Sequence, residues 1–219
     1  MPEYLSRFIP ARPRRTLDVK TLLEMGCPGF AIPTVLSLSS PALLQSQVNK
    51  FRYCHDDEDQ VARALPGVLE TGSAHCFDGA FGFLLPILYL WGYHAQIVLI
   101  NAIEDMDVDH NVVVYRRGKH LGAVAMSSFP TLKDRSPIYP SLHALMRSYY
   151  LFYTSEFPGH EGELSMRGYT DPMDIVKIFG TGWFFRRGDQ ALMDLYTVYT
   201  QGAVCTHILT GGRYPYPVE

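Results

Sequence analysis

The chain has 219 residues, of which 47% are hydrophobic and 19% charged, so one domain can bury a sizeable core. The net charge of −3 at pH 7 argues against a nucleic-acid-binding protein, whose surface would carry an excess of Lys and Arg. There is no run of about eighteen apolar residues, and MPEYLSRFIP lacks the apolar core of a secretory signal. We therefore expect a cytoplasmic protein that binds neither nucleic acid nor a membrane.

The sequence of the N-terminal quarter, up to about residue 52, predicts short helices. Residues 1–40 are rich in Pro and Gly and predict an N-terminal arm with one helix over 17–25. A helix is expected from Pro41 to about residue 52, because proline suits the first helical position and a serine precedes it as N-cap. We place the main domain at residues 41–219, with a helical C-terminal extension.

A longer helical pattern follows. The apolar residues over 61–65 have helical spacing. We expect Pro66-Gly67, which follows directly, to end or interrupt that helix. From Ala74, apolar residues recur every three or four positions as far as Leu88, which is typical of one buried helix face. Pro86 should kink this helix, because proline removes a backbone donor.

Strands dominate the middle of the chain. The apolar run 95–103 and the segments 110–118 and 119–128 predict three strands, the last two joined by a turn at Arg117-Gly118. Residues 129–140 predict a loop. Helices are expected over 141–153 and 188–200, with a turn-rich connector between them.

Four widely spaced cysteines, Cys27, Cys54, Cys76 and Cys205, predict free thiols in a reducing compartment. Of these, Cys76 begins the long amphipathic helix. Unpaired N–H groups and the positive end of the helix dipole favour the thiolate there, which is the reactive form of cysteine. The alternative is a small buried apolar residue.

A catalytic thiolate needs a base, and His110 at the head of a predicted strand is the candidate. The group that orients the imidazole would come from the next strand, where Ser127 and Ser128 are the polar residues, or from Asp109. Strand alternation places Asp109 on the face opposite His110, which weakens its candidacy.

The substrate side of this hypothesis has four further candidates. Ser73 belongs to a run of small residues that would let a substrate approach the backbone, and His75 would add positive charge beside the thiolate or cap the helix. Gln60 and Tyr53 are candidates for a second oxyanion donor. The Cys and His spacing lacks the paired clips of a structural zinc site, so we expect no metal and no cofactor.

The segments GSAHCFDGA (72–80), DVDHNVVVYRRGKHLGAVAMSS (107–128) and SPIYPSLHALMRSYY (136–150) stand in an order that resembles the transglutaminase-like cysteine enzymes. They are similar to the small bacterial members of that superfamily over roughly residues 50–155. The resemblance implies an α+β, papain- or transglutaminase-like core in which the cysteine helix packs on an antiparallel sheet. It also implies acyl transfer at Cys76 with His110 as base.

The superfamily carries an Asp on the strand after the histidine, and this sequence has serines there instead. We therefore keep two hypotheses. The first is a cysteine-dependent enzyme acting on a peptide, an amide or a carrier-bound acyl thioester, by hydrolysis or by amide formation in biosynthesis. The alternative is a non-catalytic module that keeps the fold and binds a peptide or small ligand in the cleft. The oligomeric state is left open.

Overall fold

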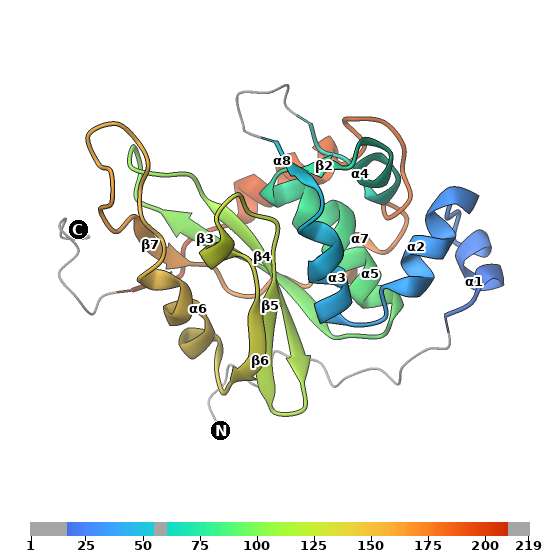
Figure 1. Cartoon of the computed structure of the whole chain (residues 1–219), viewed down its shortest axis with the longest axis horizontal. Coiled ribbons are helices and arrows are strands. Elements are labelled where there is room, and N and C mark those ends of the chain that lie inside the picture. Colours follow the sequence, from blue (N-terminus) through green and yellow to red (C-terminus); the bar gives the residue numbers. More distant parts are fainter. Residues whose placement is uncertain (1–16, 55–60, 210–219) are drawn as a thin grey trace.

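The computed structural model describes residues 17–54 and 61–209. In this part of the chain, a six-stranded antiparallel sheet curls between helices that cover both of its faces (Figure 1). The mixed α+β class that the sequence predicts is therefore confirmed. None of the described helices is long and apolar enough to pass through a lipid bilayer.

The sheet has the strand order β6-β5-β4-β3-β7-β8. Its strands are β3 (Ala95–Ala102), β4 (His110–Arg117), β5 (His120–Val124), β6 (Arg135–Tyr139), β7 (Met166–Tyr169) and β8 (His207–Ile208). β4 pairs with β3 from His110 opposite Ile100 to Tyr115 opposite Ala95. Its other edge pairs with β5 across a tight turn at Gly118, whose φ of 61° suits glycine. This arrangement places His110 at the end of a central strand.

Each face of the sheet packs into a separate hydrophobic core. Val113 and Tyr115 of β4 pack with the helices of the N-terminal half, whereas Val112 and Val114 pack with α6 (Leu142–Tyr150). Side chains alternate along a strand, so neighbouring residues of β4 serve opposite layers. In Figure 1, α6 lies on one side of the sheet and α3 and α5 lie on the other.

The N-terminal helices are α1 (Val19–Glu24), η2 (Gly29–Ala31), α2 (Ile32–Ser37) and α3 (Pro41–Val48). The predicted helix over 17–25 and the start at Pro41 are confirmed, with Ser40 accepting a hydrogen bond from the N–H of Leu43 as N-cap. α3 ends earlier than expected, because the chain turns at residues 49–51 into β1 (Arg52–Tyr53). Leu22 and Val35 are fully buried in the main core; the boundary at residue 40 stays a prediction.

Pro66 begins a helix rather than ending one. α4 (Leu65–Thr71) has Pro66 in its first turn and Gly72 at its C-cap, with a φ of 61°. The expectation that Pro66-Gly67 ends or interrupts a helix is therefore wrong. A proline fits the first turn because the N–H that it lacks has no partner inside a helix at that position. α4 leads directly into β2 (Ser73–Ala74), which pairs in parallel with β1.

The long helix from residue 74 is two segments of different winding. Cys76 and Phe77 open it, η3 (Asp78–Leu84) is a π-helix, and α5 (Leu85–Leu90) continues it with Pro86 in its first turn. The winding thus changes directly before Pro86, and the kink itself stays a prediction. A wider turn before the proline accommodates the ring and the missing backbone donor, and π-segments of this kind are frequent at functional sites.

The three middle strands are confirmed, but the loop predicted over 129–140 is wrong in part. That segment holds η4 (Pro130–Leu132) and the edge strand β6, where exposed and half-buried residues alternate around Pro137. A proline is tolerated at a sheet edge because the missing N–H faces no partner strand. Strand β7 lies in the segment predicted as a connector. The later helices are α6, α7 (Ile175–Phe179) and α8 (Met193–Gly202).

Candidate active site

Cys76 lies at the start of the helical segment, as the sequence predicts. The carbonyl oxygen of His75 accepts the first helical hydrogen bond, from the N–H of Gly79 at 2.9 Å. Cys76 itself is half-buried, whereas every residue of η3 behind it is buried. The short β1–β2 pair immediately before the helix fixes where the helix begins. The sulfur is therefore presented from a rigid core to a partly open surface.

Four groups surround the sulfur. The Nδ2 of Asn111 lies 3.5 Å from Sγ, and the backbone carbonyl oxygen of Asp109 lies 3.9 Å from it. The imidazoles of His110 and His75 are the other two groups, close enough to act on the pKa of the thiol. Burial alone would raise the pKa of Cys76. Hydrogen bonding and charge from the two imidazoles, His110 first, outweigh burial and lower the pKa from 9.0 to about 6.

The ring of His110 is buried and held by the backbone. Its Nε2 lies 3.1 Å from the carbonyl oxygen of Leu132. A carbonyl oxygen can only accept, so Nε2 carries the proton in the neutral ring, and Nδ1 is left to exchange a proton with the thiol. Leu132 is the last residue of η4, on the far side of the turn that follows β5. The group that orients the imidazole is therefore a main-chain oxygen.

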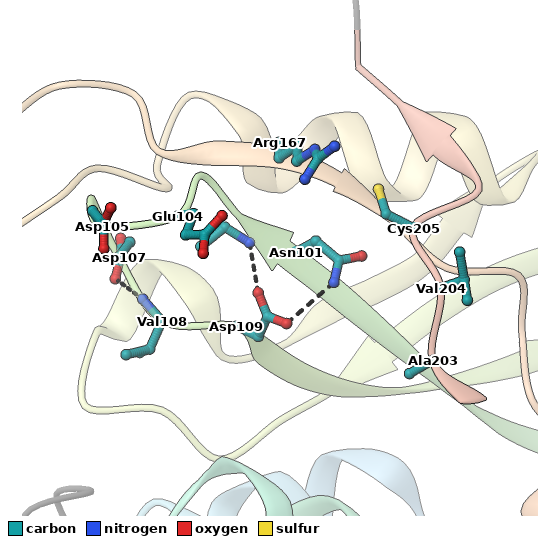
Figure 2. Close-up of a pocket in the computed structure, with 11 residues that line it drawn as sticks. Asn101, Glu104, Asp105, Asp107, Val108, Asp109, Arg167, Ala203, Val204 and Cys205 are labelled. Atoms are coloured by element: carbon teal, nitrogen blue, oxygen red, sulfur yellow. Dashed lines mark hydrogen bonds between the residues drawn. The ribbon is translucent and has the colours of Figure 1, made fainter. Parts of the chain in front are cut away.

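None of the three side chains predicted for that role, Ser127, Ser128 and Asp109, hydrogen-bonds to the imidazole in the described structure. The Oγ of Ser127 accepts a hydrogen bond from the N–H of Phe129 at 3.1 Å, which closes a local turn. The carboxylate of Asp109 accepts from the N–H of Ala102 at 2.8 Å and from the Nδ2 of Asn101 at 3.1 Å (Figure 2). Asp109 therefore reaches the sulfur through its backbone carbonyl, while its carboxylate is bonded to β3.

His75 has a structural contact at each ring nitrogen. Its Nε2 lies 2.8 Å from the carbonyl oxygen of Val61, and its Nδ1 accepts from the N–H of Phe77 at 3.0 Å. Burial disfavours the imidazolium, whereas Cys76 and Asp78 favour it and raise the pKa of His75 to about 9. The acceptor role of Nδ1 requires a lone pair there, so protonation of the ring would forfeit the Phe77 bond, which opposes that rise.

A buried ion pair lies beneath the cysteine. The backbone N–H of Arg63 donates to Asp78 Oδ1 at 2.8 Å, and its Nε donates to Oδ2 at 3.1 Å. The side chains are 5% and 0% exposed. Burial raises the pKa of Asp78, and His75 and Arg63 oppose that rise. Arg63 also donates to the hydroxyls of Thr71 and Ser73, so it ties the incoming chain to the first helical turn behind Cys76.

Sequence reasoning missed Asn111 and Tyr199. The hydroxyl of Tyr199, on α8, donates to Asn111 Oδ1 at 2.7 Å, which leaves the amide nitrogen to face the sulfur. Both residues are buried, and the Tyr199 ring packs edge-on against Phe81 at 4.7 Å between centroids. α8 is thereby attached to the cysteine helix, and its tyrosine fixes which end of the carboxamide meets the thiol.

The residues predicted on the substrate side differ in their surroundings in the structure. Ser73 is buried, and its Oγ accepts from Arg63, so it does not face a substrate. Tyr53 is half-buried and lines a cavity of about 390 Å³ that also includes His110. Gln60 lies outside the described residues. In the described ranges, no three His, Cys, Asp or Glu side chains gather as a metal-binding group.

Sequence comparison adds no name to this arrangement. No protein-family model matches the chain, and no curated protein matches it. The geometry around Cys76 therefore carries the functional argument.

Proposed function

We propose that the chain is a cysteine-dependent acyl-transfer enzyme with a papain- or transglutaminase-like core. One observation supports this most directly: the half-buried thiol at a helix start lies 3.5 Å from Asn111 Nδ2 and 3.9 Å from the Asp109 carbonyl oxygen. These two residues flank His110, whose ring is bonded to the Leu132 carbonyl. A nucleophile, a base and a group that orients the base are the three parts that covalent catalysis requires. A thiol retained only for packing would have hydrocarbon around it rather than two imidazoles and an amide.

The chemistry follows from the positions. His110 Nδ1 takes the thiol proton, and the Cys76 sulfur attacks a carbonyl carbon, so that an S–C bond forms and the carbonyl electron pair moves to oxygen. When the intermediate collapses, the bond to the leaving nitrogen or sulfur breaks, and the imidazolium returns its proton to that atom. Water or an amine then attacks the thioester carbonyl carbon and passes its proton to His110. The S–C bond breaks as this intermediate collapses, and the Cys76 sulfur takes the proton back from His110. This sequence needs no metal or redox partner.

The Asn111 carboxamide supplies the remaining polar group of the site. Its N–H lies toward the sulfur because Tyr199 occupies the other end of the amide. A donor in that place stabilises the thiolate before attack. The substrate class stays as the sequence suggests: a peptide, an amide or a carrier-bound acyl group.

The deciding experiment follows acyl-enzyme formation with p-nitrophenyl acetate by intact mass. We expect one acetyl group on the full chain, located on Cys76, and none on the Cys76→Ala variant. Release of p-nitrophenol should show a burst of one equivalent in the unsubstituted protein and not in the variant. Equal turnover by both proteins, or no acylation of either, would leave the non-catalytic binding module as the better account.

A further inference from the structure

A cavity of about 390 Å³ adjoins the Cys76–His110 pair on the histidine side. His110 forms part of its wall, and so does Asp109, whose carbonyl oxygen lies 3.9 Å from the sulfur. The wall comes from β1, the loop before β4, the segment after β5 and the loop after α6. A group attached to the reacting carbonyl can therefore extend past His110 into this space.

The position of the cavity assigns it to one side of the reaction. In the proposed mechanism, the acyl group stays on the sulfur, while the leaving atom must lie beside the imidazole that protonates it. The nucleophile of the second half-reaction must lie in the same place, since His110 takes its proton. A cavity bounded by His110 is thus suited to the leaving or accepting group.

The lining of the cavity limits which leaving or accepting groups it can bind. Most of the surface that lines it is apolar, and Phe129, Leu132 and Phe157 are among the side chains that contribute. Its charged residues are Asp107, Asp109 and Glu156, and no Lys or Arg belongs to the wall as the structure describes it. The carboxylates of Asp107 and Asp109 are hydrogen-bonded within the protein, whereas Glu156 is exposed at the surface. An aromatic body would be accommodated, and a phosphate or carboxylate would be repelled.

We infer that this cavity binds an amine with an aromatic or large apolar body and no negative charge, as the leaving or accepting partner of acyl transfer. The inference rests on the proposed function and deepens it. It favours amide substrates over thioesters of phosphorylated carriers, because a carrier arm would bring phosphate against the carboxylates.

The test is acyl capture by three matched amines. Acetyl-enzyme is formed with p-nitrophenyl acetate, and the ratio of amide to acetate is measured at equal free-base concentrations of ethylamine, phenethylamine and 4-(2-aminoethyl)benzoate. This ratio is set after acylation, so it does not depend on how fast the acyl-enzyme forms. We expect phenethylamine to be captured at least about tenfold better than ethylamine, because its ring gains the apolar wall. 4-(2-aminoethyl)benzoate, which adds a carboxylate to the same ring, should show little of the advantage that phenethylamine has over ethylamine.

Two variants at exposed wall positions sharpen the result. Phe157 is 39% exposed, and Phe157→Ala should lower the preference for phenethylamine severalfold. Glu156→Gln should raise capture of the carboxylate-bearing amine. Ile138→Ala is the control, since Ile138 is 66% exposed and lies outside the cavity wall; the three ratios should not change in it.

The outcomes separate the two proposals. Equal capture of all three amines by a protein that is acylated at Cys76 overturns the cavity assignment and leaves the proposed function standing. A preference for the carboxylate-bearing amine overturns it as well. If the protein forms no acyl-enzyme, or if Cys76→Ala forms one, the proposed function fails and the cavity assignment falls with it.

Discussion

The Nε2 of His110 lies 3.1 Å from the carbonyl oxygen of Leu132. This contact gives the imidazole a fixed tautomer and orientation without a carboxylate. The main chain of η4 therefore takes the position that the sequence led us to seek in an acid or a serine.

The thiol of Cys76 should react at unusually low pH. Its pKa is lowered to about 6 by hydrogen bonding with the imidazoles, so the thiolate is present above pH 6 and is lost as the pH falls below it. We expect the rate of iodoacetamide alkylation at Cys76 to be half-maximal near pH 6, measured by peptide mass mapping between pH 4 and 10. Cys27, whose pKa burial raises to about 11, is the internal control. A midpoint near 9 for Cys76 would contradict the arrangement.

Replacement of His110 should remove both the base and one charge partner of the thiolate. In His110→Gln, we expect acylation by p-nitrophenyl acetate to fall about 10²- to 10⁴-fold and the alkylation midpoint of Cys76 to move upward. His75→Gln serves as comparison, because His75 is bonded to Val61 and Phe77 and has no base role. Loss of the His75 imidazole should change the alkylation midpoint of Cys76, with a smaller effect on the acylation rate than in His110→Gln. An equal loss in both variants would argue that His110 is not the base.

The carboxamide of Asn111 should hold the thiolate in place. Asn111→Asp keeps the shape but puts a carboxylate beside the sulfur, so the pKa of Cys76 should rise by about 1 or more. Tyr199→Phe removes the hydroxyl that orients the amide and should raise that pKa by a smaller amount. Alkylation pH profiles measure both, and urea unfolding reports any accompanying loss of stability. Unchanged profiles in destabilised variants would reduce Asn111 and Tyr199 to packing residues.

The Arg63–Asp78 pair should dominate the local stability of the site. Asp78→Ala leaves a buried guanidinium without its carboxylate, and we expect the free energy of unfolding to fall by about 3–5 kcal/mol. Asp194→Ala is the matched control, because its partner Arg186 forms a surface pair with side chains 45% and 66% exposed; there the expected loss is about 0–1 kcal/mol. Urea denaturation of both variants tests the difference. Similar losses would mean that burial does not set the strength of the Asp78 pair.

The helix start at Cys76 and the strand start at His110 could be predicted because each residue occupies a recognisable place in a pattern; their catalytic roles stay a proposal. Cys76 opens an apolar helix, and His110 opens an apolar strand, so the helix start and the strand end could be expected to meet. The same reasoning missed Asn111, although alternation places it on the helix-facing side of β4 together with Val113. The third group was expected on the next strand or at Asp109, whereas Asn111 is the residue directly after His110.

The remaining parts of the site have weak sequence signals. The Leu132 oxygen belongs to the backbone, which every residue carries, so no residue type marks it. Arg63 lies in a segment whose spacing predicts a helix, and only the fold shows that it reaches Asp78. Tyr199 approaches from α8, 88 residues from Asn111. Contacts over such separations depend on how the layers close, which local patterns do not specify.

The π-winding of η3 packs about one residue more between Cys76 and Pro86 than ordinary α-winding would. Deleting one residue there would return the segment to α-winding and leave the sulfur in nearly the same orientation to the apolar stripe behind it. An insertion has no such reserve and would rotate the sulfur by about 100° relative to that stripe. The stretch should therefore tolerate a one-residue deletion better than a one-residue insertion.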